Sequence, residues 1–207
     1  MGHVITIAQQ KGGAGKTTLA VTLAVEFLQR GQRVALLDTD PQGSLGRWFM
    51  ARRDRNRTEG LDFSTASAWG VSYECEKLRK TNDLVIVDTP PKVDADLRPA
   101  LREADLVLIP VASSHVDLWA VDGMLDLIAR EGRQAMIVLN RWKAGTRLAQ
   151  DVASAAGDKA RVATSRLGNR VVYAETLGLG LAATESARGA TRGEVAALAD
   201  EVAAALP

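Results

Sequence analysis

The sequence predicts an α/β fold, with a mostly parallel, twisted sheet and helices on both of its faces. Short apolar runs alternate with stretches whose apolar residues recur at helical spacing. A glycine-rich segment lies between the first predicted strand and the first predicted helix, and polar residues directly follow several strands. We expect one domain, residues 1–207, because a chain of this length can bury about 70% of its unfolded surface in a single core.

The first elements are a strand, a loop and a helix. An apolar run predicts a strand at residues 4–8, and the stretch AQQKGGAGKTTLA, residues 8–20, follows it. Beyond the loop, apolar residues recur at helical spacing from Leu19 to Leu28, and Gly31 is expected to end this helix. This order of elements is the context that a phosphate-binding loop requires.

Further apolar runs predict the rest of the sheet. They lie at residues 34–37, 84–87, 106–109 and 136–139, with weaker runs at 61–64 and 161–164. Three runs are followed by polar residues, in Asp38-Thr39-Asp40, Asp88-Thr89-Pro90-Pro91 and Asn140-Arg141. Because ligands of open α/β sheets bind outside the carboxyl ends of the strands, we expect these residues to converge on one site.

The loop departs from the usual phosphate-loop pattern, G-x-x-x-x-G-K-[ST]. Gln10 stands where the first glycine is expected, and Lys11 is an additional cation. The chemistry is nevertheless present, because the glycines of residues 12–15 let backbone N–H groups approach phosphate oxygens. Lys16 can reach the terminal phosphates, and Thr17 can place its hydroxyl on Mg²⁺.

Three aspartates at the predicted site have candidate roles. Asp88 follows the run DLVIV, where phosphate-loop enzymes place the carboxylate that holds Mg²⁺; the alternative is an aspartate that caps the next element. Asp38 and Asp40 are so close that their charges are costly unless a cation or a water network uses them. Asp40, further from the strand, is the better candidate for orienting the attacking water. The candidate metal ligands are Thr17, Asp38 and Asp88.

Composition excludes some classes of protein. The net charge is +1, so nucleic-acid binding would need a local basic patch or dimerisation. Cys75 is the single cysteine, and no leader pattern precedes the first strand, so we expect the protein in the cytosol. No apolar run is long enough for a transmembrane span. We expect the four arginines of residues 51–60 to lie on a solvated helix end. Trp48, Trp69, Trp119 and Trp142 are expected in the core or at an interface, with Trp48 and Trp142 partly exposed.

Five motifs carry a resemblance to a known family. KGGAGKTT, LLDTDPQGS, LVIVDTPP, VLNR and RVVYAETLG occur in the order and spacing of the ParA/MinD group of P-loop ATPases, whose deviant loop reads K-G-G-x-G-K-[ST]. The resemblance covers nearly the whole chain and implies a SIMIBI-like P-loop NTPase fold, with ATP and Mg²⁺ as cofactors. It also implies an ATP sandwich homodimer, in which Lys11 crosses to the other subunit's nucleotide and acts in trans, as an arginine finger does. The alternative is an ordinary exposed loop lysine.

The resemblance also assigns the nucleotide-binding residues. It implies that Asn140 recognises the adenine edge, and that Lys11, Lys16 and Asp40 serve catalysis. A proline that commonly packs on the base is replaced by Thr164-Ser165 in the segment TSRLGNR. The expected nucleotide-binding residues are Gly12, Gly13, Ala14, Gly15, Lys16, Thr17, Thr18, Asn140 and Arg141.

The last helix distinguishes between branches of the group. Its apolar stripe is Val195, Leu198, Val202 and Leu206, and its other face carries the acids Glu194, Asp200 and Glu201. An interfacial membrane anchor needs a basic face, so we expect this helix to pack on its own domain. A single cysteine cannot ligate an iron–sulfur cluster, which argues against the iron–sulfur members of the group. No tyrosine cluster ends the chain, which argues against the bacterial tyrosine kinases of the group. The first strand leaves no room for an amino-terminal helix-turn-helix, so we do not expect operator-specific DNA binding.

The chain therefore resembles the small, ParF-like partition ATPases. That resemblance implies weak intrinsic ATPase activity, non-specific binding to nucleoid DNA as an ATP dimer, and release when a ParB-like or cargo-adaptor partner stimulates hydrolysis. The candidate DNA contacts are Arg166, Arg170, Arg188 and Arg192. The alternative is a nucleotide-gated protein adaptor that never touches DNA. The sequence does not identify the cargo.

Overall fold

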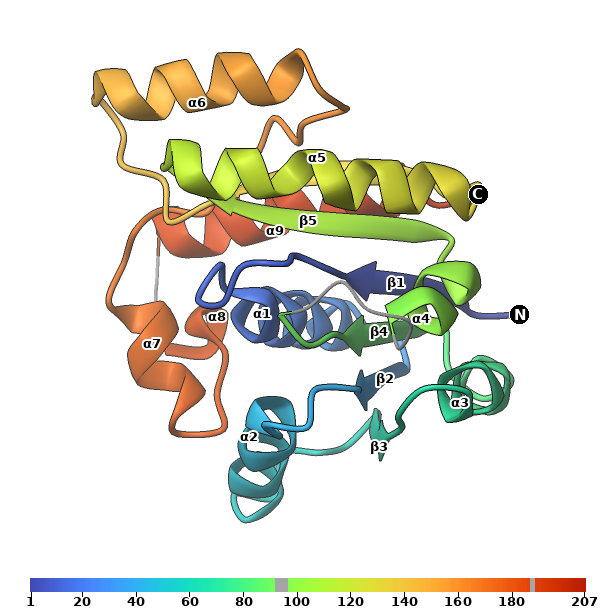
Figure 1. Ribbon diagram of the computed structural model, residues 1–207. Helices are drawn as coiled ribbons and strands as arrows, with labels where there is room; N and C mark the ends of the chain where they lie inside the picture. Colours follow the sequence, from blue (N-terminus) through green and yellow to red (C-terminus); the bar gives the residue numbers. More distant parts are fainter. Residues whose placement is uncertain (92–96, 187–188) are drawn as a thin grey trace.

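The computed structural model describes residues 1–91, 97–186 and 189–207 (Figure 1). The strands of the described part are β1 (His3–Ile7), β2 (Val34–Asp38), β3 (Leu61–Thr65), β4 (Leu84–Asp88), β5 (Leu106–Ala112) and β6 (Ala135–Asn140). Its helices are α1 (Lys16–Gln29), α2 (Ser44–Arg53), α3 (Gly70–Leu78), α4 (Leu97–Glu103), α5 (His115–Arg130), α6 (Arg147–Gly157), α7 (Val172–Leu177), α8 (Ala183–Ser186) and α9 (Ala190–Ala203).

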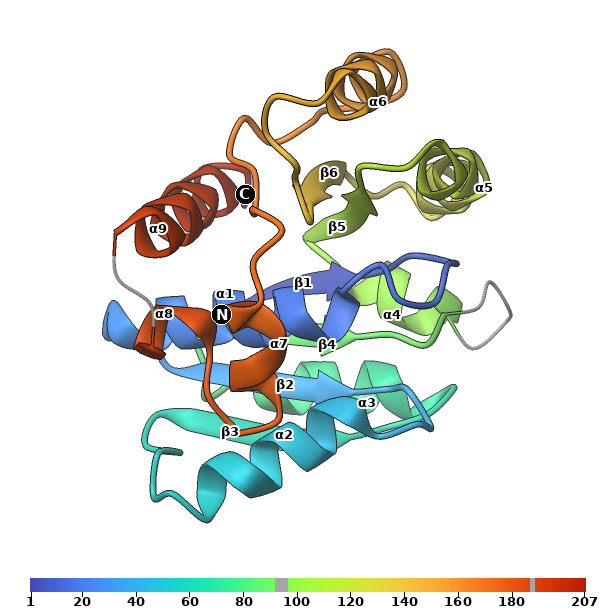
Figure 2. The same cartoon turned by 90° about the vertical axis from the view of Figure 1, so that its left-hand side faces the viewer.

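The strands form one sheet in the order β3-β2-β4-β1-β5-β6, and every pair is parallel. The predicted fold class is confirmed. The register places Ile7 beside Asp88, and Asp88 beside Asp38. The carboxyl ends of β1, β2 and β4 therefore lie together at one edge of the sheet, which faces the viewer in Figure 2.

Helices cover both faces of the sheet because the strands are apolar on both sides. Ile5 and Ile86 belong to a core that includes residues of α1, α2 and α9, whereas Val85 packs with α3 and α4 on the other face. Val107 and Ile137 pack with α5 and α6 on that second face. Both layers are visible in Figures 1 and 2.

The last helix packs on its own domain, as its pattern predicts. Val195, Leu198 and Val202 are buried in the core beside α1. All three residues of the acidic face are bound by other segments of the same chain, Glu194 by Arg170 and Tyr173. Asp200 accepts a hydrogen bond from Arg30 at 2.6 Å, and Glu201 accepts the backbone N–H groups of residues 164 and 165. None of the helices in the described ranges has the length and hydropathy of a membrane span.

Some local predictions are wrong. Residues 161–164 form no strand; a single bridge joins Val162 to Ile137. Trp48 is only 2% exposed, because its indole N–H donates to the Leu181 carbonyl at 3.1 Å and its ring joins the core. Trp69 and Trp119 are instead 87% and 69% exposed.

The arginines of residues 51–60 also differ from one another. Arg52 is buried and forms an ion pair with Glu185 at 2.8 Å, and Arg57 binds the same carboxylate at 3.2 Å. The prediction of a solvated helix end therefore fails for Arg52. Its guanidinium instead ties α2 to α8.

Candidate nucleotide-binding site

The loop between β1 and α1 has the backbone geometry of an anion-binding turn. Gly13 and Gly15 adopt positive φ angles of 78° and 91°, and Gly15 is the residue that precedes α1. A side chain at Gly15 would also collide with the amide of Asn140. No side chain caps the start of α1, so its free N–H groups and helix dipole remain available for an anion.

Lys16 is the cation of this loop. Only 7% of the residue is exposed, and its Nζ atom donates to the carbonyl of Gln9 at 3.2 Å. Burial lowers the pKa of Lys16, while the nearby carboxylates of Asp88 and Asp40 act in the opposite direction. A phosphate group at the loop would provide a partner for this poorly solvated charge.

Thr17 and Asp88 form the other half of the loop's chemistry. The Thr17 hydroxyl donates to Oδ2 of Asp88 at 2.6 Å, while Oδ1 of the same carboxylate is buried and has no hydrogen-bond partner among the residues that the structure describes. Burial raises the pKa of Asp88 to about 7, and the charge of Asp38 adds to this effect. The carboxylate would therefore be stabilised by a cation.

Asp38 and Asp40 have different environments. Both carboxylate oxygens of the buried Asp38 are engaged, by the backbone N–H groups of Asp40 and Gly46 at 3.0 Å each. Burial raises the pKa of Asp38. Asp40 is half-buried, lines the cavity in front of the loop and accepts one backbone N–H, from Gln42 at 2.9 Å. Of the two aspartates, Asp40 is the one that lines the cavity at the glycine loop, where it can contact a ligand or a water molecule.

The site fits Mg²⁺ only together with a ligand. The described residues contain no cluster of three or more His, Cys, Asp or Glu side chains suited to a metal. Mg²⁺ commonly binds one or two protein oxygens and completes its shell with substrate phosphates and water. The unpartnered oxygen of Asp88 and the adjacent Thr17 hydroxyl match this arrangement.

Two of the cavities at this edge of the sheet adjoin each other. The first, of 270 Å³, is lined by the glycine loop, Lys16, Thr17 and Asp40, and the second, of 320 Å³, by Asn140 and the segment 168–174. Gly15, Thr18 and Arg141 line both cavities. Because the two cavities adjoin, they suit an elongated ligand whose anionic end lies at the glycine loop. Asn140 donates to the Ala14 carbonyl at 3.0 Å, which ties the second cavity to the glycine loop.

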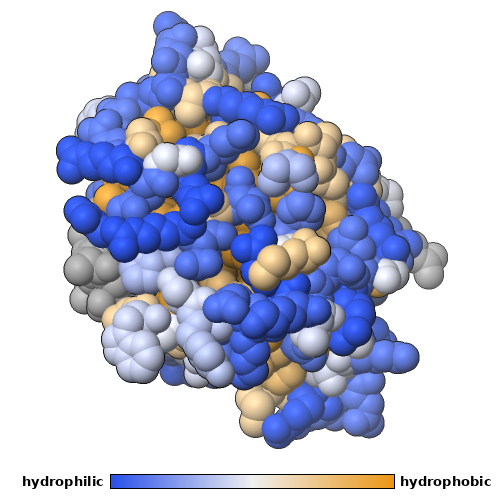
Figure 3. Space-filling model, turned by 90° about the vertical axis from the view of Figure 1, so that its right-hand side faces the viewer, coloured by the Kyte–Doolittle hydropathy of each residue, from blue (hydrophilic) through white to orange (hydrophobic). Residues whose placement is uncertain are grey.

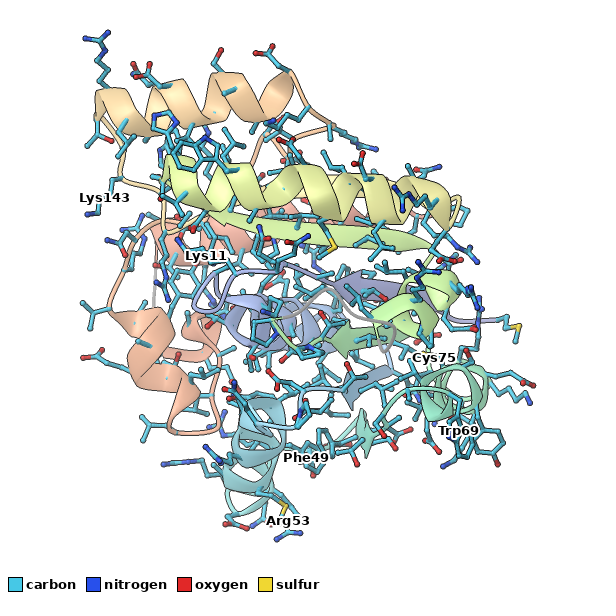
Figure 4. The ribbon with its side chains drawn as sticks, in the orientation of Figure 1. Lys11, Phe49, Arg53, Trp69, Cys75 and Lys143 are labelled. Atoms are coloured by element: carbon cyan, nitrogen blue, oxygen red, sulfur yellow. The ribbon has the colours of Figure 1, made fainter. Side chains whose placement is uncertain are left out.

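Lys11 belongs to the loop and contacts its own chain. Its Nζ atom forms an ion pair with the buried carboxylate of Asp117, near the start of α5. The Lys11 side chain is 39% exposed. Figure 4 shows it at the loop, on the same side of the molecule as Lys143. Lys11 is therefore not an unattached surface lysine.

The comparisons with known proteins agree with this geometry. Residues 5–175 match the profile of the CobQ/CobB/MinD/ParA nucleotide binding domain. The chain belongs to this ParA/MinD family. It is 34% identical over 180 residues to the maintenance of carboxysome distribution protein A of Halothiobacillus neapolitanus, covering 82% of this chain and 81% of the relative. It is 32% identical over 181 residues to the chromosome-partitioning ATPase Soj of Thermus thermophilus, covering 72% and 73%.

A solved structure supports the ParA/MinD fold. The putative plasmid partition protein of Borrelia burgdorferi, bound to AMPPNP, superposes with a TM-score of 0.81 over 99% of both chains at 18% identity. At that identity the likeness shows the shared fold. The predicted family and fold are thus both confirmed.

The candidate DNA contacts differ in their surroundings. Arg166 is exposed and stacks over the Trp142 ring at 4.1 Å, and Arg192 is exposed on α9. Arg170 lines the second cavity and pairs with Glu194 at 3.2 Å. Arg188 lies outside the described residues.

Sequence reasoning alone missed several residues of this ParA/MinD site. The backbone carbonyl of Gln9 accepts a hydrogen bond from Lys16, and the Gln9 side-chain amide donates to the Pro110 carbonyl at 3.3 Å. No contact with the site was predicted for Asp117, and Glu194 was expected only on the acidic face of the last helix, although both bind residues named as candidates. The opposite edge of the sheet, at the amino ends of the strands, shows mostly hydrophilic residues with small hydrophobic areas (Figure 3).

Proposed function

We propose that this single-domain chain is an ATP-dependent partition or positioning ATPase. Its ATP-bound homodimer binds nucleoid DNA without sequence preference, and hydrolysis stimulated by a ParB-like or cargo-adaptor partner releases it. The observation that carries the proposal is the cavity at the glycine loop, where Lys16, Thr17 and Asp40 meet beside a second cavity of nucleoside size. The names of the carboxysome-distribution and chromosome-partitioning relatives support positioning as the outcome.

The described residues have separable roles in hydrolysis. The loop N–H groups and Lys16 bind the phosphates, and the Asp88 carboxylate and Thr17 hydroxyl hold Mg²⁺. The bound Mg²⁺ would neutralise charge that develops on the phosphates. Asp40 orients the attacking water, because its carboxylate lines the phosphate cavity while both oxygens of Asp38 accept backbone N–H groups. Asn140 and Arg141 hold the base side.

Lys11 acts at the other subunit's nucleotide in this proposal. In the single chain it is paired with Asp117, so dimerisation must exchange that carboxylate for a phosphate. The exchange favours the dimer only while the partner holds ATP, since a cation gains more from a phosphate chain than from one carboxylate. Hydrolysis removes the terminal phosphate, so the exchange no longer favours the dimer.

Binding to DNA requires the dimer because one chain carries a net charge of only +1. Two copies present Arg166 and Arg192 twice, and Arg170 contributes if its ion pair with Glu194 opens. We therefore expect the protein to be cytoplasmic and associated with the nucleoid. The engagement of Arg170 and the near-neutral charge favour a second candidate, a nucleotide-gated adaptor that binds a protein partner and never binds DNA.

Sedimentation with DNA separates the two candidates. The chain is mixed with long duplex DNA at low salt, with ATP, with ADP or without nucleotide. A partition ATPase sediments with DNA in ATP and remains in solution otherwise, and Lys16→Ala remains in solution in all three. A chain that hydrolyses ATP but never sediments with DNA is the adaptor.

A further inference from the structure

The wall of the second cavity comes from a segment with little regular structure of its own. Gly168, Asn169, Arg170 and Val171 precede the short helix α7, and they line the cavity together with Tyr173. On one side this segment is fixed by the chain that follows β6. The backbone N–H of Trp142 donates to the Leu167 carbonyl at 2.8 Å, and the backbone N–H of Asn169 donates to the Trp142 carbonyl at 2.9 Å.

The other side of the segment is fixed by a single carboxylate of α9. Oε1 of Glu194 accepts the Tyr173 hydroxyl at 2.7 Å and Nε of Arg170 at 3.2 Å, and Oε2 accepts Nη2 of Arg170 at 3.3 Å. The Glu194 side chain is only 14% exposed. Burial, reinforced by the Glu194 carboxylate, raises the pKa of Tyr173, so its hydroxyl stays protonated and donates.

These bonds shape the cavity wall. The Arg170 guanidinium folds back over Gly168, where an added Cβ would lie 3.0 Å from Nε. Tyr173 is 9% exposed and belongs to the core that α1 and α9 share. Glu194 does not line the cavity, so it acts on a ligand only through the two residues that it holds.

From this arrangement we infer that Glu194 is a positioning residue for the nucleoside part of the nucleotide. The inference rests on the proposed function, which places the phosphates at the glycine loop and leaves the adjoining cavity for the nucleoside. Glu194 holds Arg170 and Tyr173 in the conformation that forms the far wall of that cavity. The last helix thereby contributes to nucleotide affinity, although it lies behind the site.

Two ligands separate this role from a purely structural one. Mg²⁺-ATP uses both cavities, whereas Mg²⁺-tripolyphosphate uses only the loop. Glu194→Ala should weaken ATP binding about tenfold and leave tripolyphosphate binding within about twofold of the wild type. In steady-state hydrolysis the KM for ATP should rise about tenfold with little change in kcat, because Lys16, Thr17 and Asp40 are untouched.

Matched variants control for damage to α9. Asp200→Ala removes an ion pair from the same helix, to Arg30 and away from the cavities, and should bind both ligands normally. Glu194→Gln keeps an acceptor for the Tyr173 hydroxyl and should recover part of the ATP affinity. It also keeps the test informative if Glu194→Ala fails to fold.

The outcomes distinguish the inference from the function on which it rests. Equal losses for ATP and tripolyphosphate, or normal ATP affinity in folded Glu194→Ala and Glu194→Gln, would overturn the role of Glu194 alone. A wild-type chain that binds neither ligand would overturn the proposed function as well. A selective loss for ATP, with partial recovery in Glu194→Gln, supports the inference.

Discussion

At the scale of single residues, burial makes the charged groups of the loop dependent on a ligand. Lys16 and Asp88 are both nearly inaccessible, and burial shifts the pKa of each toward its uncharged form. Among the described residues, the Nζ atom of Lys16 donates to one carbonyl, and the Asp88 carboxylate accepts from one hydroxyl. A bound phosphate would pair with Lys16, and the cation bound to that phosphate would pair with Asp88.

Replacing Lys16 by Ala should weaken the binding of Mg²⁺-ATP by about a hundredfold or more, because the loop loses its buried cation at the phosphates. Lys143→Ala is the matched control, since this exposed lysine lies on the same side of the molecule (Figure 4). Calorimetric titration measures both affinities. Wild-type affinity in Lys16→Ala would mean that the loop does not bind the phosphates.

Replacing Asp40 by Ala should leave ATP affinity near the wild-type value and lower turnover by about a hundredfold or more, because the variant loses the group that aligns water. Single-turnover phosphate release measures this. Asp38→Ala is a contrasting variant: two backbone N–H groups lose their acceptor, so its melting temperature should fall. Normal turnover in Asp40→Ala would move the water-aligning role to another residue, Asp38 first.

At the scale of elements, α5 holds the signature lysine of the loop. Replacing Lys11 by Ala should leave ATP binding to the monomer nearly intact, because the glycines, Lys16 and Thr17 remain. ATP-dependent dimerisation should fail, since a charge-assisted contact of roughly 1.5–3 kcal/mol per hydrogen bond is lost twice in a symmetric dimer. Analytical ultracentrifugation with a slowly hydrolysed ATP analogue measures the dimer constant.

The control for this variant is Asp117→Asn, which removes the charge that holds Lys11 within its own chain. Its dimer should be at least as stable as that of the wild type. If Lys11→Ala dimerises normally and hydrolyses ATP, the lysine does not act in trans.

Elements were predictable where a local pattern is sufficient. The strand–loop–helix order around Lys16 and the aspartates at the ends of β2 and β4 follow from short apolar runs, and parallel pairing brings Asp38 beside Asp88. Contacts between segments far apart in the chain were not predictable. Burial of Trp48 depends on the chain near Leu181, and the pairing of Lys11 depends on the start of α5. Residues 161–164 have an apolar pattern but form only one bridge to β6.

At the scale of the whole molecule, the balance of charge means that the proposed DNA binding would require the dimer. A chain with a net charge of +1 offers phosphate backbones little attraction, and two copies side by side double each local cluster of arginines. ATP would thus control DNA binding through assembly, without any change in the arginines themselves.

The central claim, that ATP converts the chain into a dimer that binds DNA through phosphates, is tested most directly by a salt titration. Affinity for two unrelated duplexes of equal length is measured by fluorescence anisotropy in a slowly hydrolysed ATP analogue, over a range of salt concentrations. We expect equal affinities and a linear fall of log K with log salt, with about −0.9 per phosphate contact. Arg166→Ala with Arg192→Ala should flatten the slope on both duplexes alike. Binding that needs no nucleotide, ignores salt or selects one sequence would contradict the claim.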